Sequence, residues 1–415
     1  MIWSDLNKNR LYYIINLLLF AFFSTLITIK NAYYIAPLLL VLISFFVIAR
    51  NKSEIVISKY IKYYIFSALS FYLVSFFVAL INGDSIPSSF KADHFLILSI
   101  PIILLLQKYK LTFNFIALVF GVSSFIYGIS AIYNKFFIGI ERAFSYIHPI
   151  PAGAIIMTVS LYCFIFGVNY LITNKKLLGI LMLCSASVGL FGNILTGSRG
   201  TWLIFPVAIV VLSFHYRKYL KNIIIPFLVS ILALVIIAGF IPQTGIQKRY
   251  NEAISDVTQY FDGSNKETSI GMRFELWRSA FQGIKEKPLL GWGKDGMDEK
   301  RLEQSKSSDF PSIIKDFPHT HNLFIEQAFY RGIIGLVFLV LFIYTLGFFY
   351  IKMYRKAESE EKKLIALLGI INVLALLSFS LSDALLRLKE YAMFFYMCNV
   401  IFYAMTIDNN RRLTE

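Results

Sequence analysis

The chain has 415 residues, of which 57% are hydrophobic, 17% aromatic and only 16% charged. A water-soluble globular protein of this composition would expose far too much apolar surface, so that class is excluded. The formal net charge is +15, but the basic residues lie between long apolar segments, which argues against a nucleic-acid-binding protein. We therefore predict an all-α polytopic membrane protein.

Apolar runs recur along the whole chain, most of them about as long as the 17–25 residues that cross a bilayer. They predict about twelve transmembrane helices within one integral membrane domain, residues 1–415. The fourth and eighth runs are shorter than the others. The runs lie near 11–29, 33–49, 61–82, 94–106, 112–133, 150–172, 178–196, 201–215, 223–241, 322–350, 364–382 and 391–408.

The connections between these runs alternate between many and few basic residues. The rich set holds Lys8, Arg10, Arg50, Lys52, Lys59, Lys62, Lys108, Lys110, Lys175, Lys176, Arg217, Lys218, Lys221, Lys352, Arg355, Lys356, Lys362, Lys363, Arg411 and Arg412. The poor set holds Lys30, Lys91, Lys135, Arg142, Arg199, Arg387 and Lys389. By the positive-inside rule, both termini are predicted to be cytoplasmic. The long segment 242–320, between the ninth and tenth spans, is then predicted to lie outside.

The segment 242–320 divides into parts of different character. Residues 247–260 and 269–286 are predicted to be helical, with turn-rich sequence between them, and residues 295–315 read as charged and irregular. In the second helix, a wheel at 100° per residue places five apolar side chains on one line, and Leu276 and Ala280 widen it. These five are Ile270, Phe274, Trp277, Phe281 and Ile284.

Arg273 lies within the widened apolar arc of this second helix. The other polar side chains of the helix lie outside the arc: Glu275, Arg278, Gln282 and Lys285. The pattern is typical of an amphipathic helix that rests on the membrane body or on lipid headgroups, with one arginine directed toward the buried side.

Two external arginines are candidate phosphate ligands. Arg199 lies in the turn Thr-Gly-Ser-Arg-Gly-Thr at 196–201, whose glycines would expose backbone N–H groups beside Ser198. Arg199 could instead extend to lipid headgroups from the interface. A buried Arg273 must find an anion, because an uncompensated charge is costly to bury. That anion could be a phosphate, or it could be Glu326 or an acidic loop residue in a structural pair.

The stretch Pro-His-Thr-His-Asn at 318–322 brings a possible proton-transfer group to the membrane boundary. We expect the tenth span to begin here, so that the helix N-terminus favours neutral imidazole at His321 and binds anions. His319 and His321 could instead bind a metal, although no matching carboxylate or cysteine set is visible, or could be structural. Asn322 is a further candidate for substrate binding.

Glu326 lies one turn beyond Asn322, at hydrocarbon depth, where it needs a partner. It could orient His321 or pair with an arginine. Gly332 and Gly335 would permit a kink or close packing in the same span. Arg249 and His148 could line an acceptor groove. The set Asp383, Arg387 and Lys389 reads as an exposed ion-pair cluster.

The sequence contains no GxxxxGK[ST], and we expect neither ATP nor a dinucleotide as a cofactor. No cofactor of another kind is predicted either. An activated donor would have to arrive from elsewhere, for instance through the membrane itself.

Several motifs in this order resemble the O-antigen ligase/polymerase superfamily of bacterial inner membranes. They are Gly-Ser-Arg-Gly at 197–200, Arg-Phe-Glu-Leu-Trp-Arg-Ser-Ala at 273–280, Pro-Leu-Leu-Gly-Trp-Gly at 288–293, His-Thr-His-Asn-Leu-Phe-Ile-Glu-Gln at 319–327 and Arg-Gly-Ile-Ile-Gly at 331–335. Within the superfamily, the chain looks most like the ligases of lipopolysaccharide biosynthesis. The run Arg-Tyr-Asn-Glu-Ala at 249–253 contributes to this likeness.

The resemblance implies a glycosyltransferase that uses neither metal nor ATP. Such an enzyme moves glycan from undecaprenyl diphosphate to a sugar hydroxyl of lipid A–core at the periplasmic face, with inversion. It also implies that Arg199 and Arg273 are essential arginines and that His321 is the essential histidine. Two readings remain open beside the ligase. A polymerase would use the same donor, and a lipid or polysaccharide flippase would perform no chemistry.

Overall fold

The computed structural model describes residues 2–50, 57–85, 92–144 and 147–407. Four of the basic residues used to predict the topology lie outside these ranges, as does residue 408 of the last apolar run: Lys52, Lys91, Arg411 and Arg412. Within the described ranges the chain is built of helices and contains no strand, which confirms the predicted fold class.

Every predicted apolar run falls on a helix. These helices are α1 (Ile2–Thr25), α2 (Ala32–Arg50), α3 (Lys59–Ile81), α5 (His94–Lys108), α6 (Phe113–Ile132), α7 (Pro149–Ile172), α8 (Lys176–Leu195), α9 (Ile204–His215), α10 (Ile225–Gly239), α14 (Leu323–Lys356), α15 (Glu360–Ser380) and α16 (Lys389–Thr406). Among the described residues, 8 helices are long and apolar enough to cross a membrane. The fourth and eighth runs form shorter apolar helices, as expected. The protein is thus multi-pass, and the total of twelve crossings stays a prediction.

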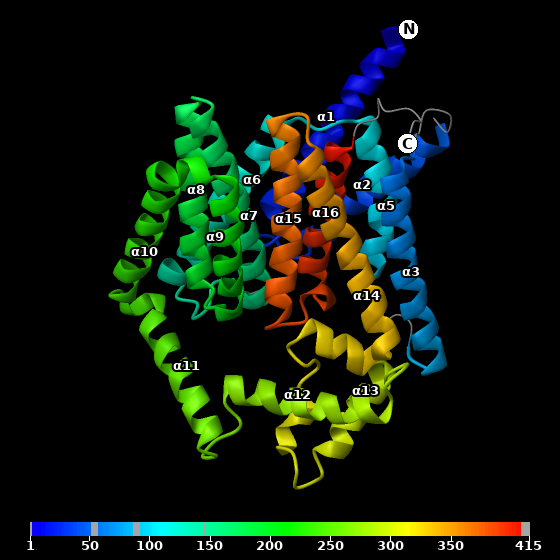
Figure 1. The fold of residues 1–415 in the computed structure, drawn as a ribbon, viewed down its shortest axis with the longest axis vertical. Coiled ribbons are helices and arrows are strands. Elements are labelled where there is room, and N and C mark those ends of the chain that lie inside the picture. The colour runs from blue at the N-terminus through cyan, green and yellow to red at the C-terminus, as the bar shows by residue number, and fades with distance from the viewer. Residues whose placement is uncertain (1, 51–56, 86–91, 145–146, 408–415) are drawn as a thin grey trace.

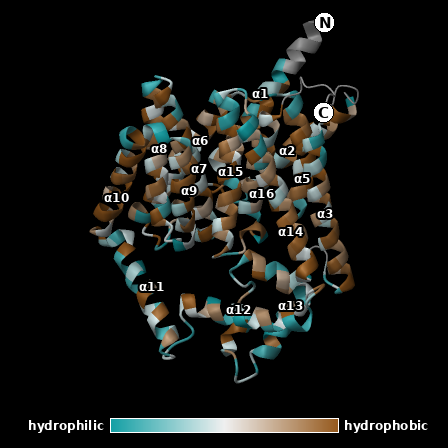
Figure 2. Cartoon of the chain, in the orientation of Figure 1, coloured by the Kyte–Doolittle hydropathy of each residue, from teal (hydrophilic) through white to brown (hydrophobic). Residues whose placement is uncertain are grey.

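The helices form a bundle, and apolar residues, brown in Figure 2, also occupy the helices at its periphery (Figures 1 and 2). In α7 and α15, 83% and 78% of the most apolar window is buried inside the protein, whereas in the α10 segment only 17% is buried. Helices that are apolar all round need either protein or lipid on every side. α7 and α15 therefore belong to the protein core, and α10 presents most of its surface to the surroundings.

The segment 242–320, predicted to lie outside the membrane and called the extramembrane segment, lies at the end of the bundle opposite the start of α1 and the end of α16 (Figure 1). It contains α11 (Ile246–Phe261), α12 (Ser269–Glu286), α13 (Gly293–Gln304) and the short 3-10 helix η7 (Ser312–Asp316). The two predicted helices are confirmed. The prediction that 295–315 is irregular was wrong, because α13 spans residues 293–304 and so covers the first part of this stretch. α13 buries Met297 and Arg301 against α14, and this tertiary packing stabilises a helix that its polar sequence does not predict.

The orientation of α12 also differs from the prediction. Its buried face consists of Gly271, Met272, Glu275, Leu276, Ser279, Ala280 and Gly283. The predicted apolar line lies on the opposite side, where Phe281 is 52% exposed. Glu275 is only 1% exposed because it accepts hydrogen bonds from Arg278 and Tyr260. Tertiary partners thus outweigh the hydrophobic periodicity of the helix.

Gly332 breaks α14 and attaches the extramembrane segment to the bundle. Its backbone has φ 65° and ψ −172°, which confirms the predicted kink and which residues other than glycine essentially never adopt. The amides released by the kink find acceptors in the α12–α13 turn: Ile333 N–H donates to Pro288 O at 2.8 Å and Ile334 N–H donates to Leu289 O at 3.3 Å. The kink therefore holds that turn against the membrane helix.

We expect Gly332→Ala to destabilise the protein. A Cβ at this position would lie 2.1 Å from the carbonyl oxygen of Leu289, and the backbone strain alone costs roughly 1–3 kcal/mol. Thermal unfolding of the purified protein in detergent should show a lower midpoint. Gly239→Ala is the matched control, since its Cβ would meet nothing within 4 Å. Equal midpoints for the two variants would contradict this account.

Candidate functional site

The turn after α8 positions Arg199. Thr196 and Gly197 donate their N–H groups to carbonyls at the end of α8, and Ser198 donates to the Thr196 hydroxyl, so these three amides are not available to a ligand. Arg199 itself follows in the 3-10 helix η3 (Arg199–Leu203), donates to Arg249 O at 3.0 Å and lies 3.7 Å from Asp256 Oδ2. Its guanidinium is therefore held between the turn and α11 rather than extended to the surroundings.

Gly200 brings the same turn against the loop that follows α15. A Cβ at Gly200 would lie 2.1 Å from the Ser382 hydroxyl, so only glycine permits this approach. Asp383 is the next residue of that loop. The turn and the loop, far apart in sequence, thus meet at one place.

The sequence predicts that the histidines lie in the first turn of the tenth span. In the structure they lie before α14 instead. Asn322 is the N-cap, and its side chain accepts from Phe324 N–H at 3.0 Å and Ile325 N–H at 3.1 Å. Asparagine is one of the preferred residues at this position, which explains why the helix begins one residue after it. His321 has φ 55°, so its imidazole leaves the chain from a left-handed position and not along the helix.

Glu326 does not orient His321 through any contact in the described part of the chain; it forms an ion cluster instead. It pairs with Arg387, lies 3.8 Å from Arg301 and accepts from Thr320 N–H at 2.8 Å. The carboxylate and Arg301 are essentially fully buried. Glu326 thus neutralises two arginines and fixes the backbone between His319 and His321. The reading of Arg387 as part of an exposed set was wrong.

We expect Glu326→Ala to be strongly destabilising. Removal of one partner from a buried pair leaves an uncompensated charge, which costs about 3–5 kcal/mol. Two guanidinium groups would lose their carboxylate here. The thermal midpoint should fall well below that of Glu252→Ala, which removes a half-exposed ion pair with Arg249. Similar midpoints for both variants would rule out a structural role for the cluster.

Asp383 is a residue whose place in the site sequence reasoning missed. It is 2% exposed, not part of an exposed cluster, and its carboxylate lies between both histidines. His319 Nε2 is 3.1 Å from one oxygen and His321 Nδ1 is 3.4 Å from the other. The sequence offers only one signal for it, a carboxylate directly after a membrane span. The reading was wrong because the chain folds this loop inward over the histidines.

The electrostatics of this group favour a neutral His321 beside an ionised Asp383. Burial lowers the pKa of His321, and the Asp383 hydrogen bond only partly opposes that effect. Burial also works against the charge of Asp383, but its interactions with His319 and His321 outweigh this and hold its pKa below the ordinary value. An ionised carboxylate only accepts hydrogen bonds, so His321 carries its proton on Nδ1 and leaves Nε2 free to accept another.

The predicted residues Ser198, Arg199, Arg249, Arg273 and His321 line one cavity of about 330 Å³. Arg142 and His148 line it as well. Asn322, His319 and Glu326 are not among its lining residues. His319 contacts the His321 ring, Asn322 caps α14 directly after it, and Glu326 holds the backbone at Thr320. Within the described residues, the walls contain four arginines and the single carboxylate of Glu267, so the cavity favours an anion.

Two of these arginines, Arg273 and Arg142, differ in how their charges are compensated. Arg273 has no ion pair among the described side chains, and burial lowers its pKa. The predicted structural pair with Glu326 does not form. Arg142, which sequence reasoning did not single out, donates from Nε to Thr196 O at 2.9 Å and so keeps its remaining donors near the cavity. The only sequence signal for Arg142 was the scarcity of external basic residues.

A second cavity of about 480 Å³ adjoins the first and shares Arg142, Gly197, Ser198, Arg199 and Arg249 with it. Its remaining walls include the apolar side chains of Leu195, Trp202 and Ile246, from α8, η3 and α11. Lys135, Lys248 and Glu141 line it as well, and Lys248 pairs with Glu141 at 2.9 Å. The pair of cavities therefore joins an apolar space to a cationic one, the arrangement that an amphiphile with an anionic head requires.

His319, His321 and Asp383 could also hold a metal ion, since they offer one ligand atom each within 4.8 Å of one another. The sequence showed no carboxylate to match the histidine pair, and the tertiary structure supplies one. Three such ligands with an open fourth position resemble a catalytic zinc site in composition. The same geometry also fits a metal-free His321 held in place by the Asp383 carboxylate. Activity in the presence of a chelator separates a metal site from this metal-free arrangement.

Comparisons with known proteins relate part of the chain to O-antigen ligases. The family model described as O-antigen ligase matches residues 180–340, which include the turn, the extramembrane helices and the histidines. An uncharacterized protein of Haemophilus influenzae is 29% identical over 96% of this chain and 99% of its own length. An O-antigen ligase of Escherichia coli K12 is 27% identical over 59% of this chain and 56% of its own length.

Proposed function

We propose that the chain, whose residues 180–340 match the O-antigen ligase family model, is a member of that superfamily and transfers glycan from undecaprenyl diphosphate to a sugar hydroxyl of lipid A–core. The reaction takes place at the periplasmic face of the bacterial inner membrane, with both termini in the cytoplasm. The observation that carries the proposal is the position of His321. Its ring is backed by Asp383 and borders a cavity lined by four arginines.

The donor fits the two adjoining cavities. The diphosphate occupies the cationic cavity, where Arg199 and Arg273 bind its oxygens in the bidentate manner that guanidinium groups allow. The polyprenyl chain leaves through the apolar cavity beside Trp202 and Ile246. Because α10, next to this cavity, is mostly unburied, the polyprenyl chain reaches lipid without crossing the protein core.

In the reaction, the acceptor hydroxyl attacks the sugar carbon that carries the diphosphate. A carbon–oxygen bond to the acceptor forms as the carbon–oxygen bond to phosphate breaks, with inversion at that carbon. The hydroxyl proton passes to Nε2 of His321, and undecaprenyl diphosphate leaves with the electron pair. The arginines stabilise the negative charge that grows on the leaving group, so no nucleotide is needed.

The test is a reconstitution with purified protein, undecaprenyl-diphosphate-linked glycan and lipid A–core, without ATP and with EDTA. We expect glycan-laddered lipid A–core by gel analysis. Lengthening of the undecaprenyl-linked glycan with bare lipid A–core would instead identify a polymerase. Loss of transfer in EDTA, restored by Zn²⁺, would assign His319, His321 and Asp383 to a metal. No change in either substrate would favour a flippase.

A further inference from the structure

The aromatic side of α12 is only partly covered within the described structure: Trp277 bonds to Thr320 and Phe274 packs on Tyr260, but Phe281 remains exposed. Phe274 and Trp277 are half-buried and Phe281 is 52% exposed, while the helix packs on the bundle through its other side. Large aromatic side chains are costly to leave in water, so a row of them beside a cavity indicates a binding surface. The proposed reaction assigns no role to this row.

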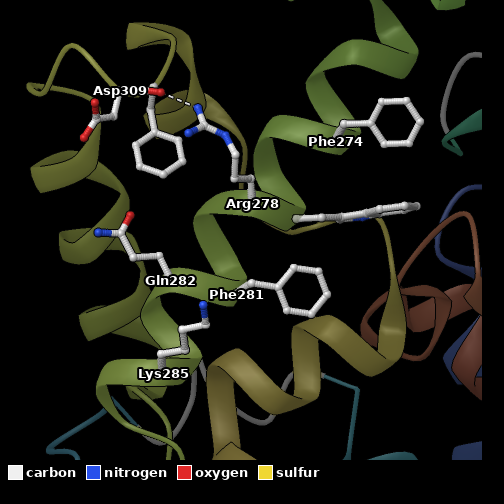
Figure 3. Close-up of a pocket in the computed structure, with 8 residues that line it drawn as sticks. Phe274, Arg278, Phe281, Gln282, Lys285 and Asp309 are labelled. Carbon is white, nitrogen blue, oxygen red and sulfur yellow. Dashed lines mark hydrogen bonds between the residues drawn. The ribbon is translucent and has the colours of Figure 1, made fainter. Parts of the chain in front are cut away.

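These aromatic residues border an open groove of about 480 Å³, which lies within the range of roughly 300–1,000 Å³ typical of ligand sites. Figure 3 shows Phe274 and Phe281 on one side of α12 and Arg278, Gln282 and Lys285 on the other, toward Asp309. The groove, lined also by Trp277 and Phe310, is called the α12 groove below. It therefore combines aromatic rings with several hydrogen-bonding groups.

The polar wall of the α12 groove is partly fixed and partly free. Arg278 donates to Glu275 and to the Asp309 carbonyl and lies 4.1 Å from the centre of the Phe310 ring, so its charge is compensated. Lys285 has no ion pair among the described residues, and the Asp309 carboxylate is likewise free of a described partner. Donors and an acceptor thus remain available on one side of the aromatic row.

The α12 groove is connected to the loop that carries His321. Trp277 lines the groove and donates from Nε1 to Thr320 O at 2.8 Å, one residue before His321. A ligand in the groove would therefore contact Trp277, the side chain that also bonds to the loop carrying His321. Tight binding of an anion is not what the groove offers, because its arginine is already paired.

We propose that the α12 groove binds the saccharide part of a substrate of this enzyme. Sugar rings present apolar C–H faces that stack on aromatic rings and hydroxyls that bond to amide, ammonium and carboxylate groups. The α12 groove supplies both kinds of wall, whereas a lipid chain would leave Lys285 and Asp309 without water or partners. The proposal rests on the proposed transferase function, and the saccharide comes from either the acceptor core or the donor glycan.

The experiment uses the full chain in nanodiscs and saturation-transfer NMR with two probes. These are lipid-free core oligosaccharide and O-antigen polysaccharide released from its carrier. We expect Phe281→Ala and Lys285→Ala to weaken binding of one probe about 2–10-fold, the size of effect expected for one lost aromatic contact. The KM for the corresponding substrate should rise by a similar factor with little change in kcat. The affected probe identifies the source.

Leu302→Ala is the control, since it removes an exposed apolar side chain from α13 outside the α12 groove. Unchanged binding of both probes in the groove variants overturns the saccharide site. If the wild type still transfers glycan in that case, the proposed function stands without it. If a probe binds and the groove variants weaken it while no transfer occurs, the site stands and the proposed function fails.

Discussion

His321→Gln is expected to lower kcat for glycan transfer by about 10²–10⁴-fold, the usual contribution of a general base. Glutamine keeps the polarity and approximate size of the side chain but cannot take up the acceptor proton. The rate is measured with saturating donor and acceptor in the reconstituted assay. His94→Gln is the control, because His94 lies at the start of α5 outside both cavities, where its ring is within hydrogen-bond distance of the Tyr72 hydroxyl. Full activity of His321→Gln at normal membrane abundance would eliminate the base assignment.

The pH dependence follows from the same geometry. A base must be neutral, and the pKa of His321 is lowered by burial. Transfer should therefore persist below the ordinary histidine pKa of about 6.5 and decline only as the pH falls through the lowered value. Asp383 opposes the lowering, so Asp383→Asn should move the acid limb to still lower pH while it reduces the rate. An acid limb above the ordinary histidine value would contradict this reading.

Arg199→Lys and Arg273→Lys are each expected to reduce kcat by about 10²–10³-fold, the range for loss of one preorganised donor to a developing anion. Lysine keeps the charge but cannot make the planar two-point contact to phosphate. The loss should be greater in kcat than in KM, because the charge on the leaving group grows toward the transition state. Arg273 should be the more sensitive, since its guanidinium has no described ion pair to hold it in place.

Arg217→Lys provides the comparison for these variants, because Arg217 is an exposed residue at the far end of α9. Membrane abundance of each variant is measured beside its activity. Near-normal transfer by both cavity variants would count against bidentate binding of the diphosphate. A defect confined to KM would indicate that the arginines bind substrate and transition state equally.

The helices and much of their arrangement follow from the sequence alone. Runs of apolar residues must form helices in lipid, because backbone N–H and C=O groups find no other partners there. Charge asymmetry in the connections predicts which ends lie together, and the start of α1 and end of α16 are indeed at one end (Figure 1). The sequence also predicts α11 and α12 of the extramembrane segment, because the signals for these helices lie within a few residues of each other along the chain. Candidate residues Arg199, Arg273 and His321 also came from local motifs.

Contacts between distant segments decided the rest. The inward position of Asp383 depends on the approach of its loop to Gly200, nearly 200 residues earlier, and no local pattern encodes that approach. The partners of Glu326 come from α13 and from the loop before α16. The rotation of α12 reverses its hydrophobic prediction because Glu275 finds hydrogen-bond partners when buried. Hydrophobic periodicity tells which side of a helix avoids water, but only the tertiary structure tells whether protein, lipid or a ligand covers that side.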